Sequence, residues 1–242
     1  MDLRRAWEDN AEDWIRFART PGHDVSFEPR ILPSLLELLP PPGRLTIDLG
    51  CGEGRLTRVL RPIGHPVVAV DVSPTMIGAA AAEDPTGRYV VGDATRFPIR
   101  DGAADLVVAG MSWDDVDDVD AATVEIARVL QPGGRFCFAI LHPLNSAGAF
   151  TESAADAPFV IEGSYLDERP YTYVSDRGGI RMTFHGIHRP LQSFTRSLEA
   201  AGLLIESLRE SRVPEWQVAE NPEKARWNRV PLFLFGRAIK SR

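Results

Sequence analysis

The apolar positions of this chain fall into short continuous runs, and the segments between the runs have the spacing of amphipathic helices. The first run alternates from Leu45 to Leu49, and helical spacing follows from Leu56 to Leu60. We expect further strands at 67–71, 88–92, 105–110 and before residue 141, with helices at 73–82 and 121–130. Apolar strands that alternate with helices are typical of a parallel sheet covered on both faces. The pattern therefore predicts a doubly wound α/β fold.

The two ends of the chain frame this core. Helical patterns at 3–20 and about 28–39 precede the first strand, and a helix at 191–201, a strand at 203–209 and a last strand at 230–240 follow the core. The last two strands predict an antiparallel pair at one edge. Residues 142–190 break the alternation: they are rich in aromatic residues, Gly and Pro, and 171–184 predicts a hairpin around a glycine turn. We expect one domain made of a helical cap (1–43), a core (44–141), an insertion (142–190) and a C-terminal part (191–242).

A glycine-rich loop lies between the first strand and its helix. Gly50, Gly52 and Gly54 allow positive φ and a close approach of a ligand to the backbone, with N–H donors at the start of the helix. The spacing is G-x-G-x-G, whereas a dinucleotide fingerprint has G-x-G-x-x-G. Asp48, two residues before the first glycine, disfavours a pyrophosphate and suits a cationic amine.

Together with Val67–Asp71, this loop resembles the class I S-adenosylmethionine-dependent methyltransferases, in particular small-molecule enzymes with a type 11-like domain. The resemblance extends over nearly the whole chain. It implies a Rossmann-like, mostly parallel seven-stranded sheet with an antiparallel last strand. It also implies that 1–43 forms an N-terminal helical cap and that 142–190 forms an inserted, β-rich lid over the acceptor. S-adenosylmethionine is the cofactor that the resemblance implies.

The resemblance also implies roles in cofactor binding. The glycine loop would hold the methionine part, Asp71 would accept from both ribose hydroxyls, Met76 would flank the adenine, and Asp93 would accept from its exocyclic amine. For Met76 a helix-packing role remains open, and for Asp93 a turn before Thr95 remains open. The expected cofactor-binding residues are Asp48, Gly50, Cys51, Gly52, Gly54, Asp71, Val72, Met76, Asp93, Ala94, Met111 and Ser112.

The acceptor would lie between the cap and the insertion, because the carboxyl ends of parallel strands meet at one edge of the sheet. Aromatic and polar residues of these segments, and one after the fourth strand, are candidates for acceptor contacts. Each could equally serve in packing. They are Trp14, Phe17, Arg19, His23, Trp113, Tyr165, Tyr171 and His188.

A general base is needed only if the acceptor is a hydroxyl or a phenol-like carbon, since a neutral amine needs positioning alone. His142 is the first candidate, because it follows the fifth strand at the expected ligand-binding edge and imidazole titrates near neutral pH. An imidazole satisfied by backbone groups beside Pro143 is the alternative. Asp114 is the second candidate and His185 the third.

Composition narrows the functional class. The 242 residues are 44% hydrophobic and 25% charged, which fits one globular domain with a large core. A net charge of −7 argues against a nucleic-acid surface, which normally carries a basic stripe. Two cysteines form neither a disulfide framework nor a metal cluster, and we interpret the acidic run 114–120 as capping the next helix, without a metal.

We therefore predict a methyltransferase acting on a small-molecule acceptor, such as a secondary metabolite. With no apolar run of roughly 18 residues and a polar N-terminal helix, we expect no membrane association and a cytoplasmic location. Two alternatives remain: a tRNA or rRNA methyltransferase, and a non-catalytic or repurposed S-adenosylmethionine-binding protein. The sequence predicts no nucleic-acid partner and leaves monomer and homodimer open.

Overall fold

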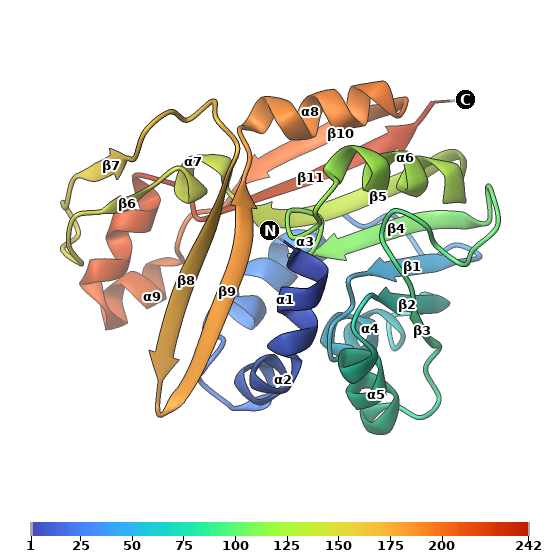
Figure 1. Cartoon of the computed structure of the whole chain (residues 1–242), viewed down its shortest axis with the longest axis horizontal. Helices are drawn as coiled ribbons and strands as arrows, with labels where there is room; N and C mark the ends of the chain where they lie inside the picture. The colour runs from blue at the N-terminus through green and yellow to red at the C-terminus, as the bar shows by residue number, and fades with distance from the viewer. Residues whose placement is uncertain (1, 242) are drawn as a thin grey trace.

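The computed structural model describes residues 2–241 and contains a seven-stranded sheet at its centre (Figure 1). The strand order is β10-β11-β5-β4-β1-β2-β3, and all neighbours are parallel except the two pairs that include β11. This confirms the doubly wound, mostly parallel sheet with an antiparallel last strand. The strands are β1 (Thr46–Leu49), β2 (Val67–Asp71), β3 (Tyr89–Val91), β4 (Ala104–Gly110), β5 (Leu130–Leu141), β10 (Leu203–Glu210) and β11 (Phe233–Lys240).

Both faces of the sheet are buried, as the continuous apolar runs predict. On β4, Val107 and Ala109 belong to one core cluster, whereas Leu106 and Val108 belong to the cluster on the opposite face. Helices α6 (Val119–Val129) and α8 (Leu191–Ala200) cover the first face. Helices α3 (Leu32–Leu36) and α4 (Arg55–Leu60) cover the second, and α5 (Pro74–Glu83) packs beside β2 and β3.

The cap differs in detail from the expected pair of helices. Residues 3–20 form two helices, α1 (Leu3–Asp9) and α2 (Ala11–Arg19), separated at Asn10. The Asn10 side chain donates to the carbonyl of Ala6, which is a local bond that competes with a continuous helix. The second pattern begins as the π-helix η1 (Phe27–Ile31) and continues as α3.

The insertion contains α7 (Pro143–Ser146), the short strand pair β6 (Gly148–Phe150) and β7 (Phe159–Ile161), and a long hairpin, β8 (Arg169–Arg177) and β9 (Ile180–His188). The hairpin turns at Gly178 and Gly179, both with positive φ, which fits a two-residue hairpin turn. It lies beside α1 and α2 in Figure 1, and the rings of Trp14 and Phe17 contact Phe184 edge-on at 6.1 and 5.9 Å.

The connection between β10 and β11 also reaches the insertion. It contains α9 (Glu215–Glu220) and the 3₁₀ helix η2 (Pro222–Asn228), which lie beside β6 and β7 in Figure 1. The Trp227 ring packs edge-on against Phe150 at 4.9 Å, and Arg226 and Arg229 donate to carbonyls of Ser153 and Ala157. The roof over the sheet edge is therefore built by the insertion and by residues 211–232 together, and the sequence pattern did not predict the second part.

Candidate active site

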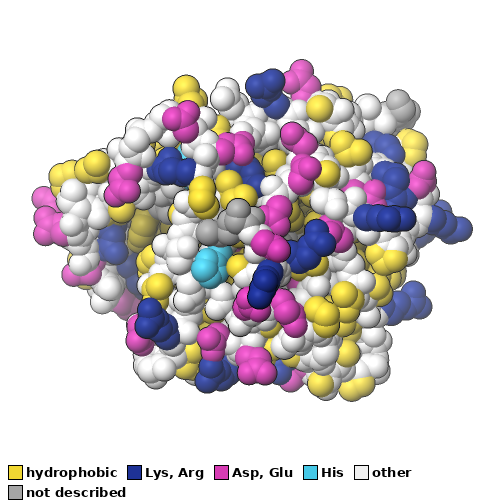
Figure 2. Space-filling model, in the orientation of Figure 1, with side chains coloured by type: hydrophobic (Ala, Val, Ile, Leu, Met, Phe, Trp, Pro, Cys, Tyr) yellow, Lys and Arg dark blue, Asp and Glu magenta, His cyan; other side chains and the backbone are white. Residues whose placement is uncertain are grey.

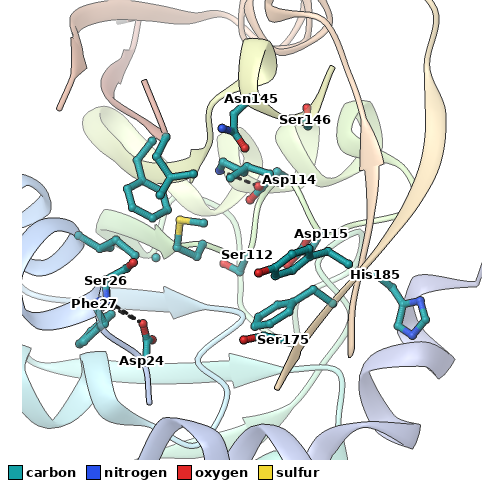
Figure 3. Close-up of a pocket in the computed structure, with 18 of the residues that line it drawn as sticks. Asp24, Ser26, Phe27, Ser112, Asp114, Asp115, Asn145, Ser146, Ser175 and His185 are labelled. Atoms are coloured by element: carbon teal, nitrogen blue, oxygen red, sulfur yellow. Dashed lines mark hydrogen bonds between the residues drawn. The ribbon is translucent and has the colours of Figure 1, made fainter. Parts of the chain in front are cut away.

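A cavity of about 1190 Å³ opens where β1, β2 and β4 end, beneath the hairpin β8–β9. Ligand pockets for one small molecule are typically about 300–1,000 Å³, so this cavity has room for two ligands side by side. We distinguish two sides of it. The β1–β2 side comprises the lining residues of 48–53, 70–76 and 92–94, and the β4–β5 side comprises those of 110–116, 141–150 and the hairpin. Figure 3 shows Ser112 between Asp24, Ser26 and Phe27 on one flank and Asp115 and Ser175 on the other.

At the β1–β2 side, the glycine loop exposes the backbone of glycines, which have no side chain. Gly50 has φ +63°, and a Cβ atom there would lie 2.3 Å from the Cβ of Ser112. Gly52 has φ +55° and lies against the indole of Trp14 on the cap. Gly54 supports the loop without lining the cavity: it precedes α4 with φ +85° and packs on Ala80 and Tyr89. Only glycine suits these positions, because each combines positive φ with a close neighbour.

Two carboxyl groups flank this loop, the buried Asp48 and the half-buried Asp71. Asp48 accepts from the Thr57 hydroxyl at 2.6 Å, and burial raises its pKa to about 7. Asp71 accepts from the amides of Gly52 at 2.8 Å and Ser73 at 2.9 Å, one on each oxygen, and burial raises its pKa. Because a carboxylate oxygen can accept two hydrogen bonds, both oxygens of Asp71 keep capacity for a further donor. A vicinal diol offers two such donors.

The neighbouring wall is suited to a flat apolar group. Val72, Met76 and Ala94 line it, and the Met76 side chain is buried at the start of α5. Asp93 itself does not line the cavity: its carboxylate accepts from Thr95 and pairs with Arg4 at 2.5 Å. A role of Asp93 toward an adenine amine stays a prediction.

On the β4–β5 side, the chain leaves β4 through Met111, the one described non-glycine residue with positive φ, at +67°. Strain of this kind persists where the surroundings fix it, and it is common at functional sites. It turns Ser112 and Asp114 toward the cavity. Asp114 Oδ2 accepts from the amide of Leu141 at 2.9 Å, whereas Oδ1 is buried without a partner. Burial raises the pKa of Asp114 to about 6.

Arg189 holds this loop from behind. Its guanidinium is buried and donates to the carbonyls of Asp114 at 3.0 Å, Val116 at 2.7 Å and Asp117 at 3.0 Å. These three hydrogen bonds fix the loop 114–117, which begins with Asp114. The hairpin adds Tyr171 to the same region, and burial raises the pKa of its phenol well above the usual value. An arginine in the insertion gave no local sequence signal for this role.

Comparison with known proteins bears on the cavity. Residues 47–138 match the model of a methyltransferase domain. An uncharacterized methyltransferase of Mycobacterium tuberculosis is 42% identical over 98 residues, and the match covers 40% of this chain and 40% of that protein. An uncharacterized methyltransferase of a Synechocystis species is 34% identical over 146 residues, which are 55% of this chain and 69% of that protein. The chain therefore spans less than half the length of the first relative.

A solved structure extends the likeness to the whole fold. An S-adenosylmethionine-dependent methyltransferase from Mesorhizobium loti is 27% identical with a TM-score of 0.72, and the match covers 86% of this chain and 96% of that one. This chain belongs to the class I S-adenosylmethionine-dependent methyltransferases. The family's cofactor fits the β1–β2 side: the glycine loop faces it, Asp71 has free acceptor capacity, and the buried indole N–H of Trp7 lines the cavity without a partner.

Most of the family-derived cofactor residues line the cavity: Asp48, Gly50, Cys51, Gly52, Asp71, Val72, Met76, Ala94, Met111 and Ser112. Among the candidates for acceptor contacts, Trp14, Phe17 and Tyr171 line it as well. The general-base candidates Asp114 and His185 also do, although Figure 3 shows the His185 ring directed away from Asp114 and Asp115. The Nδ1 atom of His185 lies 3.3 Å from the Thr172 hydroxyl.

His142, the first candidate for a base, does not line the cavity. Its Nδ1 accepts from the amide of Leu144 at 3.0 Å, so Nε2 carries the proton and donates to Glu210 on β10 at 2.9 Å. Burial lowers the pKa of the imidazole, while Glu210 acts in the opposite direction. The geometry argues against a base here, because both ring nitrogens bond to protein groups and the residue lies outside the cavity lining.

Trp113 is a core residue rather than an acceptor contact. Its side chain is fully buried, and Nε1 donates to Thr123 at 3.0 Å. The turn at Met111 directs its neighbours Ser112 and Asp114 to the cavity and Trp113 into the core beside α6.

Tyr165 and His188 form a packing pair in the insertion. The Tyr165 hydroxyl accepts from the amide of Leu191, and its carbonyl accepts from His188 Nε2 at 2.9 Å. Ser146 lies 2.8 Å from His188 Nδ1, and burial lowers the pKa of that imidazole. Neither residue lines the cavity, so the structure contradicts the expected acceptor contacts.

Arg19 and His23 also lie off the cavity, in the cap. Arg19 pairs with Glu53 at 2.9 Å and donates to the carbonyl of Ala79, which fastens α2 to the glycine loop and α5. The His23 ring packs edge-on against Phe17 at 6.1 Å. Arg19 therefore fixes the position of the cap, and neither residue lines the cavity in which acceptor contacts were expected.

Replacing His142 by Gln is expected to leave cofactor affinity and turnover within about threefold of wild type. The amide can keep a bond to Glu210, and the replaced ring touches neither side of the cavity. Steady-state kinetics on the purified variant checks this. A fall in turnover of about a hundredfold, the scale of a lost general base, would return His142 to the catalytic residues.

Proposed function

We propose that this protein transfers a methyl group from S-adenosylmethionine to a small-molecule acceptor. The observation that carries the proposal is one continuous cavity that joins the glycine loop and Asp71 to the buried carboxyl group of Asp114. Bound at the β1–β2 side, the cofactor supplies an electrophilic methyl group on a sulfonium. The acceptor would occupy the β4–β5 side beneath the hairpin.

The residues of the chain contribute positioning, exclusion of water and a proton acceptor. The cap and hairpin close over the cavity through Trp14, Phe17 and Phe184, which limits the access of water to the reacting groups. Asp114, with a pKa of about 6, is mainly ionised at neutral pH and has one oxygen free to accept a proton. A group with these properties suits a hydroxyl acceptor, which must lose its proton during transfer.

The charge of the protein surface favours a small acceptor over RNA. On the face shown in Figure 2, Lys and Arg side chains are interspersed with Asp and Glu, and no basic stripe is visible. The net charge of −7 has the same implication, because RNA binding depends on neutralising phosphates.

Among the described residues, no helix is long and apolar enough to cross a membrane, and no group of three or more potential metal ligands occurs.

Transfer of a labelled methyl group tests the proposal. The purified protein is incubated with methyl-labelled S-adenosylmethionine and, in separate reactions, with the small-molecule fraction of a cell extract or with total RNA. We expect label in a small product and none in RNA. Label in RNA would favour the RNA alternative, and cofactor binding without any labelled product would favour the repurposed binding protein.

A further inference from the structure

The cavity wall carries polar atoms that the chain itself does not satisfy. Four buried side-chain nitrogen or oxygen atoms of the residues that line the cavity lack a hydrogen-bond partner. They are Trp7 Nε1, Arg30 Nε, Asp114 Oδ1 and Asn145 Nδ2. A buried polar group without a partner lowers the stability of the folded protein by about 1–3 kcal/mol. Four such groups in one cavity therefore indicate which hydrogen-bond donors and acceptors a bound ligand should offer.

Trp7 lies near the glycine loop, on the side of the cavity that suits the cofactor. Its ring packs edge-on against Trp14 at 5.9 Å, and Trp14 lies against Gly52 in the glycine loop. The other three atoms remain for the acceptor.

Asp114 and Asn145 form a complementary pair at the ends of β4 and β5. The backbone amide of Leu141 donates to the Asp114 carboxyl group. Asn145 lies four residues after Leu141, and its backbone amide donates to the carbonyl of His142 at 2.8 Å. Both side chains line the β4–β5 side of the cavity, and in the view of Figure 3 Asn145 is drawn next to Asp114. The carboxylate needs a donor from the ligand and the side-chain amide needs an acceptor. A ligand that satisfies both presents a hydroxyl and an oxygen acceptor next to each other.

Arg30 adds a positive charge to the same region. Its guanidinium lies 5.2 Å from the centre of the Phe233 ring, and Phe233 is the register partner of Leu141, whose amide bonds to Asp114. Arg30 donates to Ser26 at 2.6 Å, while Nε is left free. Nearby Asp24 is paired with Arg55 at 2.5 Å and does not bond to Arg30. Burial lowers the pKa of Arg30 to about 10, which leaves it charged at neutral pH.

We propose that the acceptor of this methyltransferase carries a hydroxyl beside a carbonyl or carboxylate group, with Asp114 binding the hydroxyl and Asn145 and Arg30 binding the neighbouring oxygens. This rests on the proposed function and specifies its acceptor. The proton of the hydroxyl passes to Asp114, a lone pair of the acceptor oxygen forms the new C–O bond, and the electrons of the breaking S–C bond remain on sulfur. The products are a methyl ether, protonated Asp114 and S-adenosylhomocysteine.

The rest of this side favours a ring as the body of the acceptor. Phe184 and Tyr171 of the hairpin contribute aromatic faces to this side, and Phe233 of β11 also lines the cavity. The Tyr171 ring covers Gly186, its register partner on the hairpin. Aromatic pairs are stabilised beyond the area they bury. Aromatic hydroxy acids are therefore suitable probes.

Binding of isomeric probes tests the proposal. S-adenosylhomocysteine is first titrated into the protein by calorimetry, and the complex is then titrated with 2-hydroxybenzoate, 4-hydroxybenzoate and 2-methoxybenzoate, and with 1-hydroxy-2-naphthoate and 6-hydroxy-2-naphthoate. We expect each adjacent isomer to bind about tenfold tighter than its separated isomer and than the methoxy analogue, since only it satisfies Asp114 and Asn145 together.

Variants assign the preference to residues. Asp114→Asn and Asn145→Ala are each expected to reduce the preference to within about threefold, and Arg30→Gln to weaken 2-hydroxybenzoate about tenfold and uncharged 2-hydroxyacetophenone much less. Asp101→Asn is the matched control, because this exposed carboxylate pairs with Arg128 and does not line the cavity. It should keep the preference.

The outcomes separate this inference from the function on which it rests. Absence of S-adenosylhomocysteine binding would overturn the proposed function. Binding of S-adenosylhomocysteine with equal affinity for adjacent and separated isomers would overturn the acceptor class alone. A preference that survives in both Asp114→Asn and Asn145→Ala would overturn the assignment to these residues.

Discussion

Replacing Asp114 by Asn is expected to lower turnover by about a hundred- to ten-thousandfold, the range for loss of a general base. The amide oxygen can still accept from Leu141, so the loop keeps its position while the proton acceptor is lost. Affinity for S-adenosylhomocysteine should change little, because Asp114 belongs to the β4–β5 side of the cavity and the glycine loop to the β1–β2 side. Turnover of the variant above about one tenth of wild type would contradict the assignment.

The pH profile gives a second signature of the same residue. Burial raises the pKa of Asp114 from 3.8 to about 6, so the ionised base and the turnover should be lost as the pH falls through about 6. Because the raised pKa means that the folded protein binds the proton more tightly, ionisation between pH 3.8 and about 6 opposes folding. Asp114→Asn should therefore lack this acidic limb and be no less stable than wild type at neutral pH. A profile that keeps the limb would point to another base.

Replacing Trp113 by Ala is expected to lower the free energy of unfolding by about 3–5 kcal/mol, as for other large core aromatics. The ring contacts Phe136, Phe138 and Phe194 at centroid distances of 5.1, 4.8 and 5.0 Å, and its removal also leaves the Thr123 hydroxyl without the indole donor. For a chain of this size the melting temperature should fall by roughly 10 °C.

Trp216→Ala is the matched control, because 54% of that side chain is exposed. Its effect should stay within about 0.5 kcal/mol, which thermal and denaturant unfolding would measure. If Trp113→Ala melted as wild type and instead raised the Michaelis constant for the acceptor, Trp113 would be an acceptor contact after all.

The elements whose signal is local were predictable from the sequence. The strands β1, β2 and β4 are continuous apolar runs, and the glycine loop follows β1 directly, so its position at the edge of a parallel sheet followed from the pattern. The direction of a side chain just beyond a strand did not follow. Ser112 and Trp113 are neighbours, but the positive φ of Met111 sends one to the cavity and the other to the core.

The remaining errors and omissions come from contacts between distant segments. His142 is held by Glu210, 68 residues further along the chain, and Arg189 bonds to a loop more than 70 residues before it. No local sequence pattern indicates that Glu210 contacts His142 or that Arg189 contacts this loop. Arg30 and Asn145 likewise lie in segments without motif, and only the folded structure shows that both line the same cavity.

The most direct test of the account is calorimetric titration of S-adenosylhomocysteine into the wild-type protein and into Asp71→Ala. We expect binding with a dissociation constant of about micromolar order in the wild type, no binding of NAD, and a ten- to hundredfold weaker affinity in Asp71→Ala, since charged hydrogen bonds to the ribose contribute about 1.5–3 kcal/mol. Asp101→Ala, which removes an exposed carboxylate outside the cavity, should bind as wild type. Tight binding of NAD without S-adenosylhomocysteine binding, or an unchanged affinity in folded Asp71→Ala, would contradict the account.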